Sequence, residues 1–371
     1  MKNYNFSKIS DIKIFLEDNN FNRIFLLTGK KSFYFSGADK ILEKFLKNKI
    51  IKYFFKLNVY PEIKELEKII YEIKKFSPDL ILAVGGGSVL DYAKIANVLI
   101  DCKDIEKKII HSKYKINQKY CKLVAIPTTA GSGAEVTENA VIYINKIKYS
   151  VENKKIKPDF FFLLPELFLK SPYPIKSSAG FDAIAQSIES LISLKSNNSS
   201  IDFAKKSLKI SLKHYLNYLE KPNLSNALSM SIAANLSGKA INISKTTGPH
   251  ALSYPFTALY NISHGHAVSL TLNKFLKFNY INIKNSNSFF DLKKRYKILF
   301  DLTKTKNINE LDEYILQLKR KAKLEEDFMK LGINISKNYN RIISGVNPLR
   351  LKNNPIKINR SDLKKILFSQ F

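Results

Sequence analysis

The sequence is poor in several features, and each shortage excludes a class of protein. Its only cysteines, Cys102 and Cys121, fit a chain kept in a reducing compartment rather than a disulfide framework. No apolar run approaches the roughly 18–20 residues that a membrane span needs. The beginning of the chain, MKNYNFSKISDIKIFLEDNN, has no apolar core and carries acids, so it does not read as a secretory signal. We therefore expect a soluble, cytoplasmic protein with no membrane partner.

Tryptophan is absent, and 32 acidic residues face 61 lysines and arginines, which gives a formal net charge of +29. The hydrophobic share of 45% suffices for a large core and excludes a disordered tail protein. The charge has two interpretations. An AT-rich genome favours this excess of Lys, Asn, Ile, Phe and Tyr, and the lysines are spread along the whole chain without a basic block. The alternative, a nucleic-acid-binding protein, requires a clustered basic surface. We favour the first interpretation and expect no nucleic-acid partner.

Short apolar runs alternate with helical patterns in the first half of the chain. The runs end at Gly, Pro or Thr, as buried strands do, and they are RIFLLTG (23–29), KYFFKLNV (52–59), DLILAVGGG (79–87) and KLVAIPTT (122–129). Residues 38–48 and 61–76, which lie between them, have apolar side chains at helical spacing. This alternation predicts a parallel sheet covered by helices. The segment AVIYINKIKYSV (140–151) predicts a hairpin-like excursion.

The second half of the chain differs in character, because its patterns are helical and include no convincing strand. The segment SPYPIKSS (171–178) separates the two compositions and contains two prolines, so it predicts a hinge. We therefore predict an α/β domain over residues 1–174 and an all-helical domain over residues 175–371.

The stretch VGGGSVLDYAK (84–94) follows a predicted strand and opens a helix. Its glycines let a phosphate approach the backbone, and a helix N-terminus offers N–H groups and a positive dipole end. The stretch is not the G-x-G-x-x-G fingerprint, and it follows the third strand rather than the first. By itself it is consistent with a phosphate-binding turn or with a merely tight strand–helix connection.

A second polar loop, IPTTAGSGAEVTENAVI (126–142), follows the next predicted strand. It offers hydroxyl groups from Thr128, Thr129, Ser132 and Thr137, and glycines that permit close approach. Open α/β sheets bind nucleotides at the carboxyl ends of neighbouring strands. The two loops together therefore predict a nucleotide site, although each alone is ordinary loop chemistry.

Three of the five histidines lie close together in GPHALSYPFTALYNISHGHAV (248–268): His250, His264 and His266. The prolines of this stretch predict a short helix, a loop and a second helix, which lets His250 and His264 face one point. A metal site of this kind usually also needs a carboxylate or more histidines. Asp182 is a candidate, and Gln186 projects from the same helix face four residues later. The alternative for Asp182 is an acid favoured only by a helix dipole.

Four motifs, in this order and spacing, resemble the iron-containing (group III) alcohol dehydrogenases: GGGSVLDYAK, IPTTAGSGAEVT, GFDAIAQSIES and PHALSYPFTALYNISHGHAVSLTL. The resemblance covers roughly residues 20–275, and the rest matches only as a helical tail. It implies the dehydroquinate synthase-like fold of that family. This is an α/β dinucleotide-binding domain, with helices on both faces of a parallel sheet, followed by an all-α domain. In the family the active site lies between the two domains.

The resemblance assigns roles to individual positions. In the family a glycine-rich turn holds the pyrophosphate of the cofactor, and a threonine loop and a lysine lie near the nicotinamide. The matching positions here are Gly85, Gly86, Gly87, Ser88, Asp91, Thr128, Thr129, Ser132 and Lys148. The family binds its metal through an Asp, a His four residues later and two His fourteen residues apart. The matching positions are Asp182, Gln186, His250 and His264.

Gln186 stands where the family has histidine, and an amide oxygen is a weaker ligand than imidazole for Fe²⁺ or Zn²⁺. Three alternatives follow for Gln186: its amide coordinates the metal weakly, water takes its place, or the amide faces the substrate. A fourth alternative is that the whole protein is a non-catalytic member of the family. Because the other three ligands and both loops are intact, we expect retained catalysis. Many family members have another His four residues after the first of the pair, where this chain has Tyr254. Tyr254 and His266 are our candidates for returning a proton to the product.

The wording of several motifs resembles one branch of the family, the phosphonoacetaldehyde reductases, with which Gln at the second ligand position is associated. The resemblance therefore implies a metal- and NAD(P)H-dependent reductase of an aldehyde, phosphonoacetaldehyde in this branch, and a homodimer. We expect Fe²⁺, with Zn²⁺ as the alternative. Gly29 stands where an acid would hold the ribose of NAD, and Lys30 follows it, which favours NADP(H) over NAD(H). Other family activities, a lyase-type relative and the nucleic-acid binder are the alternatives.

Overall fold

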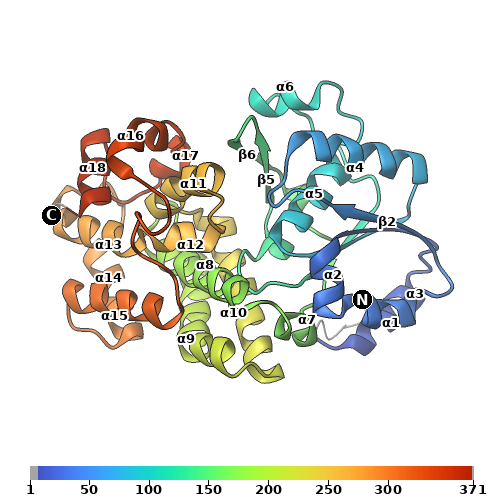
Figure 1. The fold of residues 1–371 in the computed structure, drawn as a ribbon, viewed down its shortest axis with the longest axis horizontal. Coiled ribbons are helices and arrows are strands. Elements are labelled where there is room, and N and C mark those ends of the chain that lie inside the picture. Colours follow the sequence, from blue (N-terminus) through green and yellow to red (C-terminus); the bar gives the residue numbers. More distant parts are fainter. Residues whose placement is uncertain (1–6, 370–371) are drawn as a thin grey trace. The chain divides into compact units, whose positions relative to one another are not determined.

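The computed structural model describes residues 7–369, which divide into two compact units (Figure 1). Unit 1 consists of the described residues up to Pro172 together with Pro222–Asn235, and unit 2 consists of Tyr173–Lys221 and the described residues from Leu236 onward. The division after Pro172 lies near the expected boundary. The segment Pro222–Asn235, which we expected in the helical domain, belongs to unit 1. Residues 1–6, where we expect no secretory signal, lie outside the described part.

Unit 1 contains a five-stranded sheet in the order β2-β1-β3-β4-β7, and every neighbouring pair is parallel. The strands are β1 (Arg23–Gly29), β2 (Ile50–Lys56), β3 (Leu80–Gly85), β4 (Lys122–Pro127) and β7 (Phe160–Phe161). The four apolar runs form β1 to β4, so this part of the prediction is confirmed. The two-residue β7 was not predicted, because its length is too short to show a pattern. The expected hairpin is formed by β5 (Asn139–Ile144) and β6 (Ile147–Glu152), which pair with each other in an antiparallel sheet.

Both faces of the parallel sheet are buried, and this explains why its strands are apolar without alternation. Ile24 and Leu26 of β1 pack with helices on one face, whereas Phe25 and Leu27 pack with the helices of the other. The first face is covered by α1 (Ile9–Asp18), α3 (Ala38–Leu46) and α7 (Pro165–Leu169), and the second by α4 (Ile63–Phe76), α5 (Gly87–Val98) and α6 (Ile105–Ile110). A further short helix, α2 (Lys30–Ser36), follows β1 directly.

Unit 2 is helical, apart from an isolated bridge between Ser286 and Ile356. Its helices are α8 (Tyr173–Ile192), α9 (Asn198–Glu220), α11 (Gly248–Tyr260), α12 (His264–Ser269), α13 (Leu272–Ile281), α14 (Leu292–Thr303), α15 (Ile308–Lys321), α16 (Ile335–Ser344), α17 (Pro348–Leu351) and α18 (Arg360–Phe368). Helix α10 (Leu224–Ser244) begins in unit 1 and ends in unit 2. The expected hinge at residues 171–178 is largely helical, because α8 already begins at Tyr173 and Pro174 fits its first turn.

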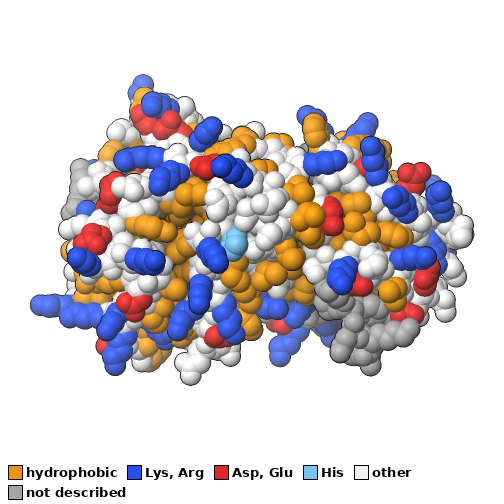
Figure 2. All heavy atoms as spheres, turned by 90° about the horizontal axis from the view of Figure 1, so that it is seen from below, with side chains coloured by type: hydrophobic (Ala, Val, Ile, Leu, Met, Phe, Trp, Pro, Cys, Tyr) orange, Lys and Arg blue, Asp and Glu red, His pale blue; other side chains and the backbone are white. Residues whose placement is uncertain are grey.

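Two features of the surface bear on partners. On the face drawn in Figure 2, Lys and Arg side chains are distributed among apolar and acidic ones, and no continuous basic surface covers the described atoms there. Within residues 7–369, no helix is long and apolar enough to cross a membrane.

Candidate metal centre and cofactor loops

Unit 2 brings together the three metal-ligating side chains that the sequence singled out. Ligand atoms of Asp182, His250 and His264 all lie within 4.8 Å of one another. Asp182 and His250 are buried, with 4% and 3% exposure, and His264 is half-buried. A carboxylate with two imidazoles is a donor set that suits Fe²⁺ or Zn²⁺. The residues present therefore fit a divalent transition-metal ion.

Three helices position these ligands. Asp182 lies in the middle of α8, His250 in the first turn of α11, and His264 at the first residue of α12. Gly265 lets α12 approach α8 closely, since a Cβ atom there would lie 1.9 Å from the carbonyl oxygen of Ser178. The His266 N–H also donates to Ser178 Oγ at 3.0 Å. Any larger residue at position 265 would push His264 away from Asp182.

His250 is held between two carboxylates. Its Nε2 lies 3.2 Å from Asp182 Oδ1, and its Nδ1 contacts Glu189 Oε2. Burial lowers the pKa of His250, but the carboxylates of Glu189 and Asp182 outweigh it and raise that pKa to about 10. In this arrangement the imidazole is fixed from both sides.

Gln186 uses both ends of its amide for protein contacts. Its Nε2 donates to Asp182 Oδ2 at 3.1 Å, and its Oε1 accepts from Ser237 Oγ at 2.9 Å. The amide oxygen is thus turned to the serine, and the amide nitrogen supports the Asp182 carboxylate. In this geometry the Gln186 amide hydrogen-bonds a candidate ligand and Ser237.

The two candidate proton donors have different surroundings. The Tyr254 ring stacks on the His264 ring, with 5.9 Å between centroids, and is only 7% exposed. His266 points its Nε2 at the carbonyl oxygen of Glu325 at 2.8 Å. A carbonyl only accepts, so this nitrogen carries the proton and is engaged. Tyr254 therefore lies against the metal-binding cluster, whereas His266 is tied to a neighbouring loop.

In unit 1 the glycine-rich turn and the threonine loop lie against each other at the carboxyl ends of β3 and β4, where Gly85 pairs with Pro127. A Cβ atom on Gly86 would lie 3.3 Å from Thr129 Oγ1, and one on Gly87 would lie 2.9 Å from Ser132 Oγ. Thr128 is buried, and its N–H donates to Gly85 O at 3.0 Å. Ser88 is half-buried in the first turn of α5, where helix N–H groups lack intrahelical partners.

Three charged side chains, Asp91, Lys94 and Lys148, interact with one another or with the segment after the threonine loop. Burial raises the pKa of Asp91 to about 6, although Lys94, the Val141 N–H and Lys148 all favour its charged form. Lys148 of β6 is thus close enough to Asp91 to act on it electrostatically. Lys94 is fully buried, and its Nζ donates to Ala134 O, Thr137 Oγ1 and Asn139 O at 2.6–2.9 Å. It therefore connects α5 to the segment that follows the threonine loop.

At the end of β1, Gly29 is buried and Lys30 is exposed. A Cβ atom on Gly29 would lie 2.9 Å from Ser32 Oγ and 3.8 Å from Cε of Lys56, its register partner in β2. An acidic side chain at position 29 would therefore need Ser32 to move, and it would lie near Lys56.

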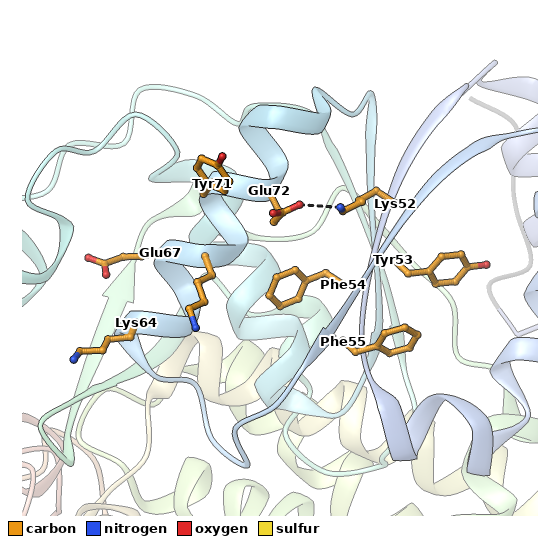
Figure 3. A pocket seen from close by; sticks show the side chains of 9 residues that line it. Lys52, Tyr53, Phe54, Phe55, Lys64, Glu67, Tyr71 and Glu72 are labelled. Atoms are coloured by element: carbon orange, nitrogen blue, oxygen red, sulfur yellow. Dashed lines mark ion pairs between the residues drawn. The ribbon is translucent and has the colours of Figure 1, made fainter.

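A groove elsewhere in unit 1 contains none of the predicted site residues. It lies between β2 and α4, where Phe54 points toward α4 and Lys52 forms an ion pair of 2.9 Å with Glu72 (Figure 3). Its lining has no histidine or cysteine. We assign it no catalytic role.

Two residues of the site were missed by the sequence reasoning. Glu189 stands seven residues after Asp182, two helical turns along the same face, so the spacing signal was present. Lys94 ends the quoted motif GGGSVLDYAK, but a lysine there reads as an exposed helix residue. Only its burial reveals that it binds the neighbouring loop.

Two family models together match most of the chain. The model described as "Iron-containing alcohol dehydrogenase" matches residues 3–165, and "Fe-containing alcohol dehydrogenase family, C-terminal" matches residues 176–371. The chain belongs to the iron-containing alcohol dehydrogenase family.

Two relatives are similar over part of their length. Phosphonoacetaldehyde reductase of Streptomyces viridochromogenes is 28% identical over 218 residues, which is 56% of this chain and 55% of the reductase. The 4-hydroxybutyrate dehydrogenase of Clostridium kluyveri is 29% identical over 58% of this chain and 59% of that enzyme. These matches therefore span little more than half the length of either relative.

Among solved structures, sulfoacetaldehyde reductase from Bifidobacterium kashiwanohense, in complex with NAD⁺, superimposes with a TM-score of 0.86 at 25% identity. The match covers 97% of this chain and 94% of that one. A 1,3-propanediol oxidoreductase gives a TM-score of 0.87 at 19% identity, which supports the fold alone.

We predict that Asp182→Ala abolishes metal binding, because it removes the one carboxylate of the cluster and leaves two imidazoles. Metal content after equilibration with Fe²⁺ or Zn²⁺ and desalting, measured by plasma mass spectrometry, should fall from about one ion per chain to background. His111→Ala, which changes a histidine of unit 1 outside the cluster, should retain the wild-type content. Equal metal content in the wild type and Asp182→Ala would show that the ion binds elsewhere.

Proposed function

We propose that this protein is a metal-dependent NAD(P)H oxidoreductase that reduces an aldehyde to a primary alcohol. The observation that carries the proposal is the convergence of Asp182, His250 and His264 in a member of this family. A divalent ion held by these residues, Fe²⁺ first and Zn²⁺ as the alternative, supplies Lewis acidity to the aldehyde oxygen, and a reduced nicotinamide supplies the hydride.

The residues of the chain orient and hold these groups. We place the pyrophosphate at the turn formed by Gly85, Gly86 and Gly87, and Ser88 lies in the first turn of the helix that begins there. We assign the hydroxyls of Thr128, Thr129 and Ser132 to the nicotinamide side, and Asp91, on which Lys148 acts electrostatically, to the cofactor site as well. Gln186 holds the Asp182 carboxylate in place by the hydrogen bond already described. Gln186 accordingly supports the site without ligating the ion.

Proton return to the alkoxide falls to Tyr254 in this proposal. Its ring is buried and stacks on the ring of His264, one of the candidate ligands. His266 was the other candidate, but its Nε2 is engaged by Glu325 O. We therefore assign His266 to holding the loop that contains Glu325.

The substrate we propose is a short aldehyde with an anionic group, phosphonoacetaldehyde first, which gives 2-hydroxyethylphosphonate. The named relatives act on a phosphonate, a sulfonate and a carboxylate of similar size. A neutral short-chain alcohol or aldehyde is the alternative, and the 1,3-propanediol oxidoreductase exemplifies it. We locate the protein in the cytoplasm, since Cys102 and Cys121 are both free thiols.

Metal-loaded protein should oxidise NADPH with phosphonoacetaldehyde, sulfoacetaldehyde or succinic semialdehyde at least about tenfold more efficiently than with propanal. A tenfold difference in kcat/KM means that the protein stabilises the transition state of the anionic aldehyde by about 1.4 kcal/mol more than that of propanal. Initial rates with each aldehyde measure this ratio. A higher kcat/KM with propanal would establish the neutral alternative. No turnover with any aldehyde, by protein shown to hold its metal, would overturn the proposed activity.

We propose a preference for NADP(H), because Gly29 carries no acid to repel a 2′-phosphate and Lys30 is exposed beside it. The wild type should therefore have a higher kcat/KM with NADPH than with NADH. Gly29→Asp should lower this ratio, whereas Asn48→Asp, which adds the same charge at an exposed position of unit 1, should leave it unchanged. A wild-type advantage for NADH would contradict this preference and establish NAD(H) as the cofactor.

We also propose a homodimer that forms along β2. Within the described residues β2 pairs only with β1, so one edge of the sheet is open. Large apolar side chains gather there, including Ile50 at 57% and Tyr53 at 42% exposure, and Figure 3 shows Tyr53 pointing away from the groove. Two copies of an edge strand can pair antiparallel about a two-fold axis, which satisfies their backbone groups.

Light scattering after size-exclusion chromatography should give twice the chain mass of 42.5 kDa. Tyr53→Lys combined with Ile50→Lys should give the monomer mass, because it places charges of the same sign from both copies at the proposed interface. Ile281→Lys, at an exposed position of unit 2, is the matched control and should remain dimeric. A monomeric wild type, or a dimer that survives the double substitution, would contradict this interface.

A further inference from the structure

Glu189 is fully buried on α8, and every contact of its carboxylate is made with the beginning of α11 or the residue before it. Oε1 accepts from the Thr247 N–H and the Thr247 hydroxyl, both at 2.8 Å, and from the His250 N–H at 3.4 Å. Oε2 contacts Nδ1 of His250. Both oxygens are therefore occupied by groups that can donate.

The contact at Nδ1 determines which nitrogen of His250 can bind a metal. A carboxylate only accepts, so Nδ1 must carry a hydrogen, and in the neutral ring this leaves the lone pair on Nε2. Nε2 is the nitrogen that lies 3.2 Å from Asp182. A carboxylate behind a ligating histidine also raises its basicity toward the metal.

The contacts at Oε1 determine where His250 stands. Thr247 is the residue before α11, and its own side chain accepts no hydrogen bond from the helix. Glu189 supplies the missing acceptor for the first turn, where a negative charge is also favoured by the helix dipole. Because Asp182 and Glu189 lie on one face of α8, a single helix provides one ligand and fixes the backbone of the helix that provides another.

We propose that Glu189 is the positioning residue of the metal centre, which sets the tautomer and the location of His250. The inference depends on the proposed binding of a metal by Asp182, His250 and His264. An amide cannot replace the carboxylate. If the amide NH₂ faced Nδ1, the ring would have to move its hydrogen to Nε2, where metal binding needs a lone pair. If it faced the beginning of α11, it would meet the N–H groups of Thr247 and His250, which can only donate.

The test compares Glu189→Gln with Glu220→Gln, an exposed glutamate of unit 2 at the end of α9. Affinity for Zn²⁺, measured by competition with a chromophoric chelator, should fall about 10- to 100-fold in Glu189→Gln, the range typical for loss of such a partner. It should stay unchanged in Glu220→Gln. Thr247→Val removes one hydroxyl contact but leaves the ring contact, so it should lower the melting temperature and keep most of the Zn²⁺ affinity.

The outcomes separate the inference from the function on which it depends. A wild type that binds no Zn²⁺ would refute the metal centre itself. If Glu189→Gln binds Zn²⁺ as tightly as the wild type does, the metal centre stands and the proposed role of Glu189 is refuted. If Glu189→Gln does not fold, the ¹H–¹⁵N spectrum of zinc-loaded wild type decides. A strongly downfield Nδ1–H signal of His250 supports the inference, and zinc bound at Nδ1 refutes it.

Discussion

Two buried carboxylates on one face of α8 organise the centre of unit 2. A carboxylate out of water costs several kcal/mol unless it is paired and hydrogen-bonded. Asp182 is satisfied by Gln186 and His250, and Glu189 by His250 and Thr247. His250 is common to both pairs, so α11 must begin beside α8. Gly265 brings α12 to the same helix by backbone contact, and with it His264.

Gln186 makes the candidate metal centre differ from the family pattern, which has histidine at this position. With its nitrogen on Asp182 and its oxygen on Ser237, it leaves a set of one carboxylate and two imidazoles. Catalytic zinc sites commonly have three protein ligands and keep a further position for water or substrate. One carboxylate and two imidazoles form a donor set of this size, and the residue at position 186 hydrogen-bonds the carboxylate.

Unit 1 depends on a different constraint, the burial of a parallel sheet on both faces. Its apolar strands end together at one edge, and there the chain must turn in little space. Gly85 is required because a Cβ atom would lie 2.6 Å from Val89 Cγ2. Lys94 then fixes the segment after the threonine loop to the helix that starts from this turn, at the cost of burying a charged group that three acceptors satisfy.

The sequence by itself determined the order of the strands along the chain, the two loops and the residues Asp182, His250 and His264. These features depend on local composition, on helical spacing and on motifs whose order is visible in one dimension. The segment 171–178, which we predicted as a hinge, is helical from Tyr173 onward, because a proline in a first turn is compatible with a helix.

Only the tertiary structure decided the partners of the buried polar groups. Glu189 and His250 are 61 residues apart, Lys94 and Ala134 are 40 apart, and Gln186 and Ser237 are 51 apart. No periodicity within one helix specifies such pairs, since each depends on how two elements pack. The sequence thus names the candidate ligands, while packing decides which buried groups hydrogen-bond to them.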